Sequence, residues 1–209
     1  MRIFLAGAAG VIGRRLVPLL VDAGHVVAGT TRSRDRAASL QSAGVNLVIV
    51  DVFDAAALHQ AVAQARPEVV IHQLTDLPQQ YDPKTFGAAL VRTARLRVEG
   101  TANLVDAARA AGARRLIAQS LAFVYAPGPL PHRESDPLNT SASGNDGSAA
   151  QAVETLDRLV TKTPGIEGVV LRYGHLYGPD TGASVSRAQH LHKIATLLAL
   201  RLCCAAVPP

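Results

Sequence analysis

An apolar run at the start of the chain passes at once into a glycine-rich turn. Residues 3–6 read Ile-Phe-Leu-Ala, and residues 7–13 read Gly-Ala-Ala-Gly-Val-Ile-Gly. A strand that turns through glycines into a helix brings backbone N–H groups close to a phosphate, and the helix N-terminus faces that phosphate with a partial positive charge. The turn therefore predicts a dinucleotide pyrophosphate site. We assign to it Gly7, Ala9, Gly10, Val11, Ile12 and Gly13.

Apolar runs of strand length alternate with helix-patterned segments along the rest of the chain. The expected strands are residues 3–6, 25–31, 46–50, 69–72, 116–120 and 169–172. The expected helices are residues 11–23, 34–43, 55–65, 85–111 and 148–162. Continuous apolar strands separated by helices predict an α/β fold, a Rossmann-like doubly wound parallel sheet of about six strands with helices on both faces.

Composition limits the function classes. The net charge of +5 comes from arginines scattered over most expected elements, with few aromatics between them, so we expect no nucleic-acid interface. The late apolar run is broken by Arg201 and is too short to span a bilayer, so we expect no membrane segment. Cys203 and Cys204 are adjacent near the end, and no secretory leader is recognisable. Both features fit a cytoplasmic protein. The histidines show no metal-ligand spacing, so we expect no metal site.

Three motifs resemble the NAD-dependent epimerase/dehydratase family, an extended or atypical branch of the short-chain dehydrogenase/reductase superfamily. They are the N-terminal glycine turn, Asp51-Val52 after the third strand, and Leu-Arg-Tyr-Gly-His-Leu-Tyr-Gly-Pro at residues 171–179. The resemblance implies that Asp51 and Val52 border the adenine and that Leu74 lines the cofactor cleft. It also implies that the segment with Arg172 and Tyr173 approaches the nicotinamide and the substrate.

The end of the second strand favours NADP, with NAD still possible. An acidic residue there would bind both ribose hydroxyls of NAD, but Thr31 takes its place and Arg32 follows. Without a carboxylate, nothing at this position repels a 2′-phosphate, and the guanidinium of Arg32 offers it a planar pair of donors. Arg36 is a further candidate. In the alternative interpretation, both arginines are solvated residues at a helix start.

Family members that transfer hydride obtain an acid from a tyrosine with a lysine four residues on. This pair is missing. If Glu154 is aligned with the acidic residue usual in the same helix, Asp146 and Ala150 occupy the places of tyrosine and lysine. Asp146 is one candidate for the missing acid, with capping of the helix that follows as the favoured alternative. Counting back from Tyr125 places Leu121, not Ser120, at the usual serine position, although a one-residue shift of the loop would restore Ser120.

We therefore predict Ser120 as the group that polarises a substrate oxygen, and Tyr125 or His175 as the proton donor. Each has a structural alternative, since a tyrosine after a strand can pack in the core and a histidine in a turn can simply hold the loop. The expected substrate is a small molecule, such as a nucleotide sugar, approached from the loop at residues 126–147.

The expected nucleotide-binding domain covers residues 1–180, and residues 181–209 form an atypical tail in which no family-type substrate lobe is recognisable. Two hypotheses stand beside hydride transfer. One is a non-catalytic NADP(H)-binding regulator, which the missing tyrosine and lysine favour. The other is a truncated, inactive remnant, which the tail favours. The long helix at residues 85–111 is also a candidate surface for a homodimer.

Overall fold

The computed structural model describes residues 1–34, 40, 43–78, 82–174 and 176. Within them, six parallel strands form one sheet in the order β3-β2-β1-β4-β5-β6. The strands are β1 (Arg2–Ala6), β2 (Val26–Thr31), β3 (Asn46–Ile49), β4 (Val69–His72), β5 (Arg115–Leu121) and β6 (Glu167–Tyr173). The expected parallel sheet is confirmed. Because the strand order reverses between β1 and β4, the carboxyl ends of these two strands flank the crevice in which such sheets bind ligands.

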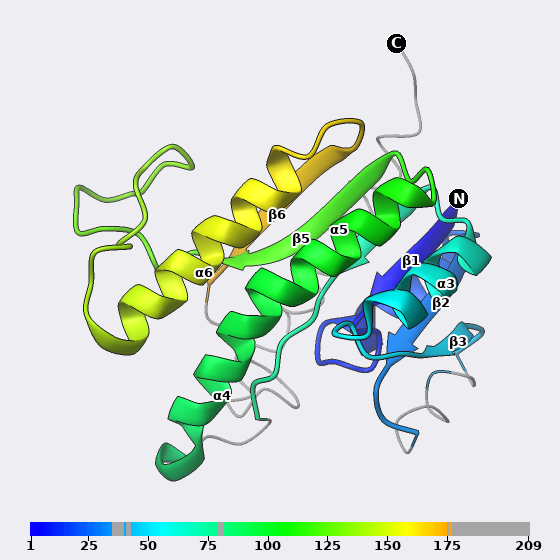
Figure 1. The fold of residues 1–209 in the computed structure, drawn as a ribbon, viewed down its shortest axis with the longest axis horizontal. Coiled ribbons are helices and arrows are strands. Elements are labelled where there is room, and N and C mark those ends of the chain that lie inside the picture. Colours follow the sequence, from blue (N-terminus) through cyan, green and yellow to red (C-terminus); the bar gives the residue numbers. More distant parts are fainter. Residues whose placement is uncertain (35–39, 41–42, 79–81, 175, 177–209) are drawn as a thin grey trace.

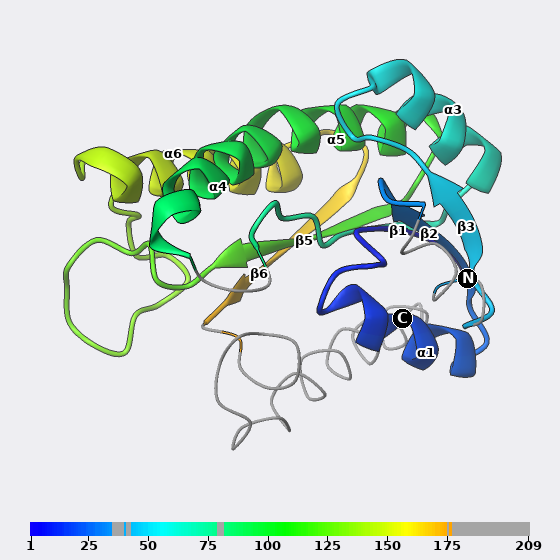
Figure 2. The ribbon, with the colours of Figure 1, turned by 90° about the horizontal axis from the view of Figure 1, so that it is seen from below.

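Helices cover both faces of the sheet, as predicted. They are α1 (Gly13–Asp22), α3 (Ala55–Ala65), α4 (Pro83–Arg95), α5 (Thr101–Ala110) and α6 (Gly144–Thr161), with a π-helical turn, η1 (Leu96–Gly100), between α4 and α5. Figure 2 shows α3, α4, α5 and α6 on one side of the sheet and α1 on the other. In Figure 1, α4 extends past the ends of the strands, so its first turns lie beyond the sheet.

Alternating side chains of the strands feed two cores. On β1, Ile3 and Leu5 pack with Leu16 and Leu20 of α1, whereas Phe4 faces the α3, α5 and α6 layer. All five side chains are almost fully buried. Burial of an aliphatic or aromatic side chain of this size stabilises a fold by about 1.5–3 kcal/mol. The two cores therefore fix the sheet between its helical layers and hold the strand ends in register.

Three helix predictions need revision. The segment expected as one helix over residues 85–111 is interrupted by η1, whose π-helical geometry no apolar pattern signals. Helix α6 begins at Gly144, four residues before the expected start, because the small polar residues there form its first turn. Asp146 is therefore not the cap: Ser143 occupies that position, and Asp146 lies within the first turn, where its charge favours the helix N-terminus. Most of the helix expected at residues 34–43 lies outside the described residues.

Candidate functional site

The glycine turn after β1 is held between the ends of two neighbouring strands. Gly7 has φ of 90°, which favours glycine, and its N–H donates to Thr30 Oγ1 over 3.2 Å. The next N–H, that of Ala8, donates to the Thr30 carbonyl over 3.1 Å. On the other side, a Cβ on Gly7 would lie 2.8 Å from the Gln73 carbonyl oxygen. Only glycine fits a turn packed this closely between β2 and β4.

The turn leads into α1 without a side-chain cap. Ile12 occupies the N-cap position and accepts no hydrogen bond with its side chain, and no acidic residue lies in the first turn. Helices α3 and α4 differ, since Asp54 caps the N–H of Ala57 and Asp82 caps that of Lys84, each over 3.0 Å. The positive end of α1 thus carries no carboxylate of its own, unlike those of α3, α4 and α6, which suits a phosphate.

A cleft of about 730 Å³, open to solvent, lies above this turn. It brings together most of the cofactor residues predicted from the sequence: Gly7, Ala9, Gly10, Thr31, Arg32, Val52 and Leu74. It also brings in residues that the sequence analysis did not nominate: Ala6, Thr30, Val50, Leu58, Gln73, Thr75 and Leu96.

Six predicted cofactor residues do not line this cleft: Val11, Ile12, Gly13, Asp51, Arg172 and Tyr173. Ile12 is buried and Val11 packs beside it in the core under α1. Gly13 allows the helix to approach the turn, because a Cβ there would lie 2.2 Å from the Gly7 carbonyl oxygen. Asp51 is exposed and accepts the Phe53 N–H over 3.0 Å, which shapes the loop that ends in Val52. Val11, Ile12, Gly13 and Asp51 therefore support the walls of the cleft without lining it.

Gln73 lines the cleft and carries a buried polar atom without a partner among the described residues. Its side chain is buried, its Nε2 donates to the Tyr173 hydroxyl over 3.3 Å, and its Oε1 has no hydrogen-bond partner among the described residues. A buried acceptor without a donor costs about 1–3 kcal/mol. Tyr173 contacts Gln73 through this hydrogen bond. Burial raises the pKa of the Tyr173 phenol, which therefore stays protonated.

Beneath the cleft, a neutral histidine supports the backbone of Leu74. His72 is fully buried on β4, its Nδ1 accepts the Leu74 N–H over 3.2 Å, and its Nε2 lies 3.0 Å from Thr101 Oγ1. Burial, together with the charge of Arg97, lowers the pKa of His72 to about 4. Arg97, on η1, is itself buried, which lowers its pKa to about 10 despite the attraction of Asp157.

A second cluster lies at the ends of β5 and β6. The Ser120 hydroxyl donates to Asp157 Oδ1 over 2.9 Å, and the other oxygen of that carboxylate accepts from Arg172 Nη2 over 2.9 Å. Arg172 also donates to the Tyr125 hydroxyl over 2.5 Å, and the Tyr125 ring stacks on His132 with 4.8 Å between centroids. Burial opposes the charge of Arg172, but its bonds to Tyr125 and Asp157 hold its pKa above the ordinary value.

The catalytic residues predicted from the sequence differ in burial and in position. Ser120 is 1% exposed and turned toward α6, whereas the Tyr125 side chain is half-buried at the edge of the cluster. Leu121 packs in a small apolar cluster with Ala150, which is buried. His175 lies outside the described residues. The nearby Asp157 was missed because a single aspartate within an amphipathic helix gives no catalytic signal.

The described residues contain neither a candidate metal centre nor a candidate membrane span. No group of three or more histidine, cysteine, aspartate or glutamate side chains in this part of the chain is arranged to hold a metal ion. No helix in the same part has both the length and the apolar character needed to cross a bilayer.

The strand order and the position of the cleft define a protein of the Rossmann class. The profile of the NAD dependent epimerase/dehydratase family matches residues 3–202, and the chain belongs to that family. The resemblance seen in the glycine turn is thereby confirmed.

Individual relatives differ in activity. The chain is 47% identical over 204 residues to a 3-diazoavenalumate denitrifying reductase of Streptomyces sp, covering 96% of this chain and 64% of the relative. It is 34% identical over 162 residues to the UDP-glucose 4-epimerase of Mycolicibacterium smegmatis, covering 73% and 50%. A short-chain dehydrogenase/reductase superfamily protein from Agrobacterium tumefaciens, solved with bound NAD, superposes with a TM-score of 0.64 at 30% identity, covering 83% and 49%. The chain thus spans about half to two thirds of the length of these relatives.

Proposed function

We propose that this chain binds NADP(H) in the cleft beside β1 and β4 and acts as a reductase on a small organic substrate. The observation that carries the proposal is the convergence of Gly7, Gly10, Arg32 and Leu74 on one cleft at the uncapped N-terminus of α1. The family is NAD dependent, and the Agrobacterium relative holds NAD. When bound, the reduced nicotinamide supplies a hydride; the chain binds it, orients it and excludes water.

The preference for NADP rests on the end of β2. The Thr31 hydroxyl turns back on its own loop, where it accepts the Ser33 N–H over 3.1 Å. Because Thr31 has no carboxylate, the end of β2 offers the ribose hydroxyls no acidic partner of the kind that NAD prefers. The side chain of Arg32 is 49% exposed and lines the cleft, so it can reach a 2′-phosphate. A charge-assisted pair contributes about 1.5–3 kcal/mol, which corresponds to a roughly tenfold to hundredfold preference for NADP.

The substrate class follows from the missing acid. Reduction of a carbonyl needs a proton on oxygen, yet the alignment through Glu154 puts Asp146 and Ala150 in place of the family's tyrosine and lysine. Hydride addition to the terminal nitrogen of an aryl diazonium group needs none. The ion Ar–N≡N⁺ accepts H⁻ to give Ar–N=N–H, which loses N₂ and leaves Ar–H, so atoms and charge balance. We therefore propose an aryl diazo compound as substrate; the name of the Streptomyces relative contains the diazo group.

The cluster at β5 and β6 then binds the substrate. Tyr125 presents its hydroxyl and ring at the edge of that cluster, and Arg172 orients the hydroxyl through the 2.5 Å hydrogen bond. Arg172 is in turn fixed by Asp157, to which Ser120 also donates. In this proposal Tyr125 contacts the substrate. Arg172 and Asp157 hold Tyr125 in position, and Ser120 stabilises Asp157.

The test begins with NADPH and NADH titrations of the purified chain and of Arg32→Ala, followed by nicotinamide fluorescence. We expect NADPH to bind more tightly, with the difference lost in Arg32→Ala. Turnover is then measured with an aryl diazo compound and NADPH, by N₂ release, by formation of the arene and by loss of NADPH absorbance. A reaction without protein is the control for spontaneous reduction.

Each other result points to a different function. Turnover of UDP-glucose without N₂ release from the diazo compound would make the chain an epimerase. Tight NADPH binding with no turnover of either substrate would favour a regulator. A folded chain that binds neither nucleotide would refute the proposal and leave an inactive remnant.

We also propose that the chain works in the cytoplasm as a homodimer. Val91 on α4 is 64% exposed and Val98 on η1 is 42% exposed, so this long helix presents apolar side chains to solvent. Burying them against a second copy would remove that apolar area from water. Light scattering of the wild type and of Val91→Lys checks the dimer, which the charged variant is expected to dissociate.

A further inference from the structure

A carboxylate at the rim of the cleft is held between two guanidinium groups from different elements. Asp76 lies after β4, and its Oδ1 is 3.4 Å from Nη2 of Arg32, which follows β2. Its Oδ2 accepts from Nε of Arg92 on α4 over 3.1 Å. The Asp76 N–H donates to Thr93 Oγ1, and Thr93 is fully buried, so the backbone of Asp76 is fixed against α4.

The cluster borders the nucleotide cleft on two sides. Arg32 lines the cleft itself, as does Thr75, the residue before Asp76. Leu96 also lines it and stands one helical turn after Arg92, so Arg92 lies at the rim on a segment that faces the cleft. An anion that enters the cleft near Arg32 therefore comes within reach of both arginines.

The charge of the cluster favours an exchange of anions. Two guanidinium groups face one carboxylate, which leaves one positive charge in excess. The side chains of Arg32 and Arg92 are 49% and 56% exposed, so water and salt weaken both ion pairs. A phosphate offers more negative charge and more acceptor oxygens than a carboxylate, and guanidinium groups bind it through paired N–H donors.

We propose that Arg92, together with Arg32, binds a phosphate group of the dinucleotide, and that Asp76 holds the two guanidinium groups in position until that phosphate replaces it. Arg92 is thereby a binding residue supplied by α4. This inference rests on the proposed function, because it requires a dinucleotide in the cleft.

The test is a set of fluorescence titrations with NADPH and NADH on the wild type, Arg92→Gln and Arg109→Gln. Arg109 is a matched control: it is an exposed arginine on α5 paired with Asp106, and it does not line the nucleotide cleft. We expect Arg92→Gln to weaken NADPH binding at least tenfold and Arg109→Gln to leave it within twofold. Unchanged melting temperatures would show that both variants fold.

The NADH arm identifies which phosphate is bound. If Arg92→Gln weakens NADPH alone, the group is the 2′-phosphate; if it weakens both nucleotides by a similar factor, the group is the pyrophosphate. Arg92→Gln binding both nucleotides like the wild type would overturn the inference while leaving the proposed function intact. A wild type that binds neither nucleotide would instead refute the proposed function itself.

A second variant tests the exchange. Asp76→Asn keeps the size of the side chain but removes the charge that competes with phosphate, so we expect NADPH to bind about threefold to tenfold more tightly. We also expect the gain to shrink at high salt, because exposed charges are then screened. Weaker NADPH binding in Asp76→Asn would show that the carboxylate assists the nucleotide and would overturn its role as a displaceable anion.

Discussion

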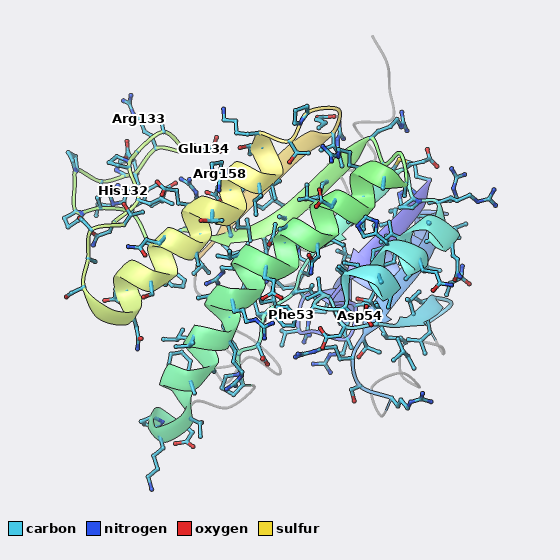
Figure 3. All side chains as sticks on the ribbon, in the orientation of Figure 1. Phe53, Asp54, His132, Arg133, Glu134 and Arg158 are labelled. Atoms are coloured by element: carbon cyan, nitrogen blue, oxygen red, sulfur yellow. The ribbon has the colours of Figure 1, made fainter. Side chains whose placement is uncertain are left out.

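The cleft beside β1, β2 and β4 is shaped mainly by backbone, whereas the cluster beside β5 and β6 is held together by side chains. Beside β1, β2 and β4, the cleft is shaped by backbone: Gly7 turns with positive φ, and Gly13 admits no Cβ. Beside β5 and β6, the second cluster is held by charged side chains, with Asp157 and Arg172 at its centre. In Figure 3, Phe53, in the loop after β3, and His132, which stacks on Tyr125, lie on either side of the α5 and α6 layer. A backbone-built site tolerates little substitution, whereas a side-chain network can change its chemistry by exchange of residues.

The largest expected effect breaks the backbone-built half. Gly13→Ala places a Cβ 2.2 Å from the Gly7 carbonyl oxygen, and this backbone contact has no flexible end that could give way. We expect the free energy of unfolding to fall by more than about 3 kcal/mol, which lowers Tm by roughly 6–12 °C in a chain of this size. Thermal unfolding of the purified variant measures the loss.

Gly10→Ala is the matched control, since its Cβ would meet only the Gly7 carbonyl oxygen, at 3.2 Å. It should keep most of the stability and lose NADPH affinity. Equal Tm values for the wild type and Gly13→Ala would contradict the close packing of α1 on the turn.

The next effect concerns the histidine under the cleft. With the pKa of His72 lowered to about 4, the folded chain keeps the ring neutral, while the unfolded chain protonates it below its ordinary pKa of 6.5. The unfolded state therefore binds more protons, and stability falls as pH drops from about 6.5 to 4, by about 3 kcal/mol in total. Urea unfolding at several pH values measures this slope.

His72→Gln removes the titrating ring and should flatten the slope between these pH values, although it also lowers stability at neutral pH. If the variant and the wild type lost stability in parallel as the pH fell, acid groups elsewhere would be responsible.

A smaller effect tests the side-chain network. Asp157→Asn leaves an oxygen for Ser120 but removes the charge that holds Arg172, whose side chain is 21% exposed. We expect a loss of about 2 kcal/mol in chemical unfolding, the size of a hydrogen bond to a charged group. Asp106→Asn removes an exposed ion pair with Arg109 and should cost less than about 0.5 kcal/mol. Similar losses in the two variants would mean that the network contributes no more than a surface pair.

The smallest effect is expected at Ser120. Because its hydroxyl is buried and donates to Asp157, Ser120→Ala should cost about 1 kcal/mol of stability and leave NADPH affinity unchanged. Steady-state kinetics with the substrate, once found, complete the comparison. A hundredfold loss of kcat with normal stability would return Ser120 to the catalytic role that the sequence suggested.

The comparison also explains what could be predicted. The cleft was accessible to sequence analysis because Gly7 and Gly13 are required by local geometry and stand next to an apolar strand. The network was not, because Asp157 is brought to Ser120 only when α6 packs on β5, 37 residues along the chain. Gln73 was missed for the same reason. A single amide after an apolar strand gives no signal in the sequence, and only the structure shows that its Oε1 is buried without a partner among the described residues.

The π-helical turn has a consequence for sequence alignment. A π turn holds one residue more than an α turn, so removing one residue from Leu96–Gly100 would rotate α4 by about 100° relative to α5. Arg92 and Thr93 would then leave Asp76, while Thr101 would keep its place beside His72. Comparison with a relative that has a straight helix here would need a one-residue gap inside the helix, at a place where gaps are rarely introduced. A gap placed in the neighbouring loop would pair α4 with the wrong residues and conceal a change in specificity.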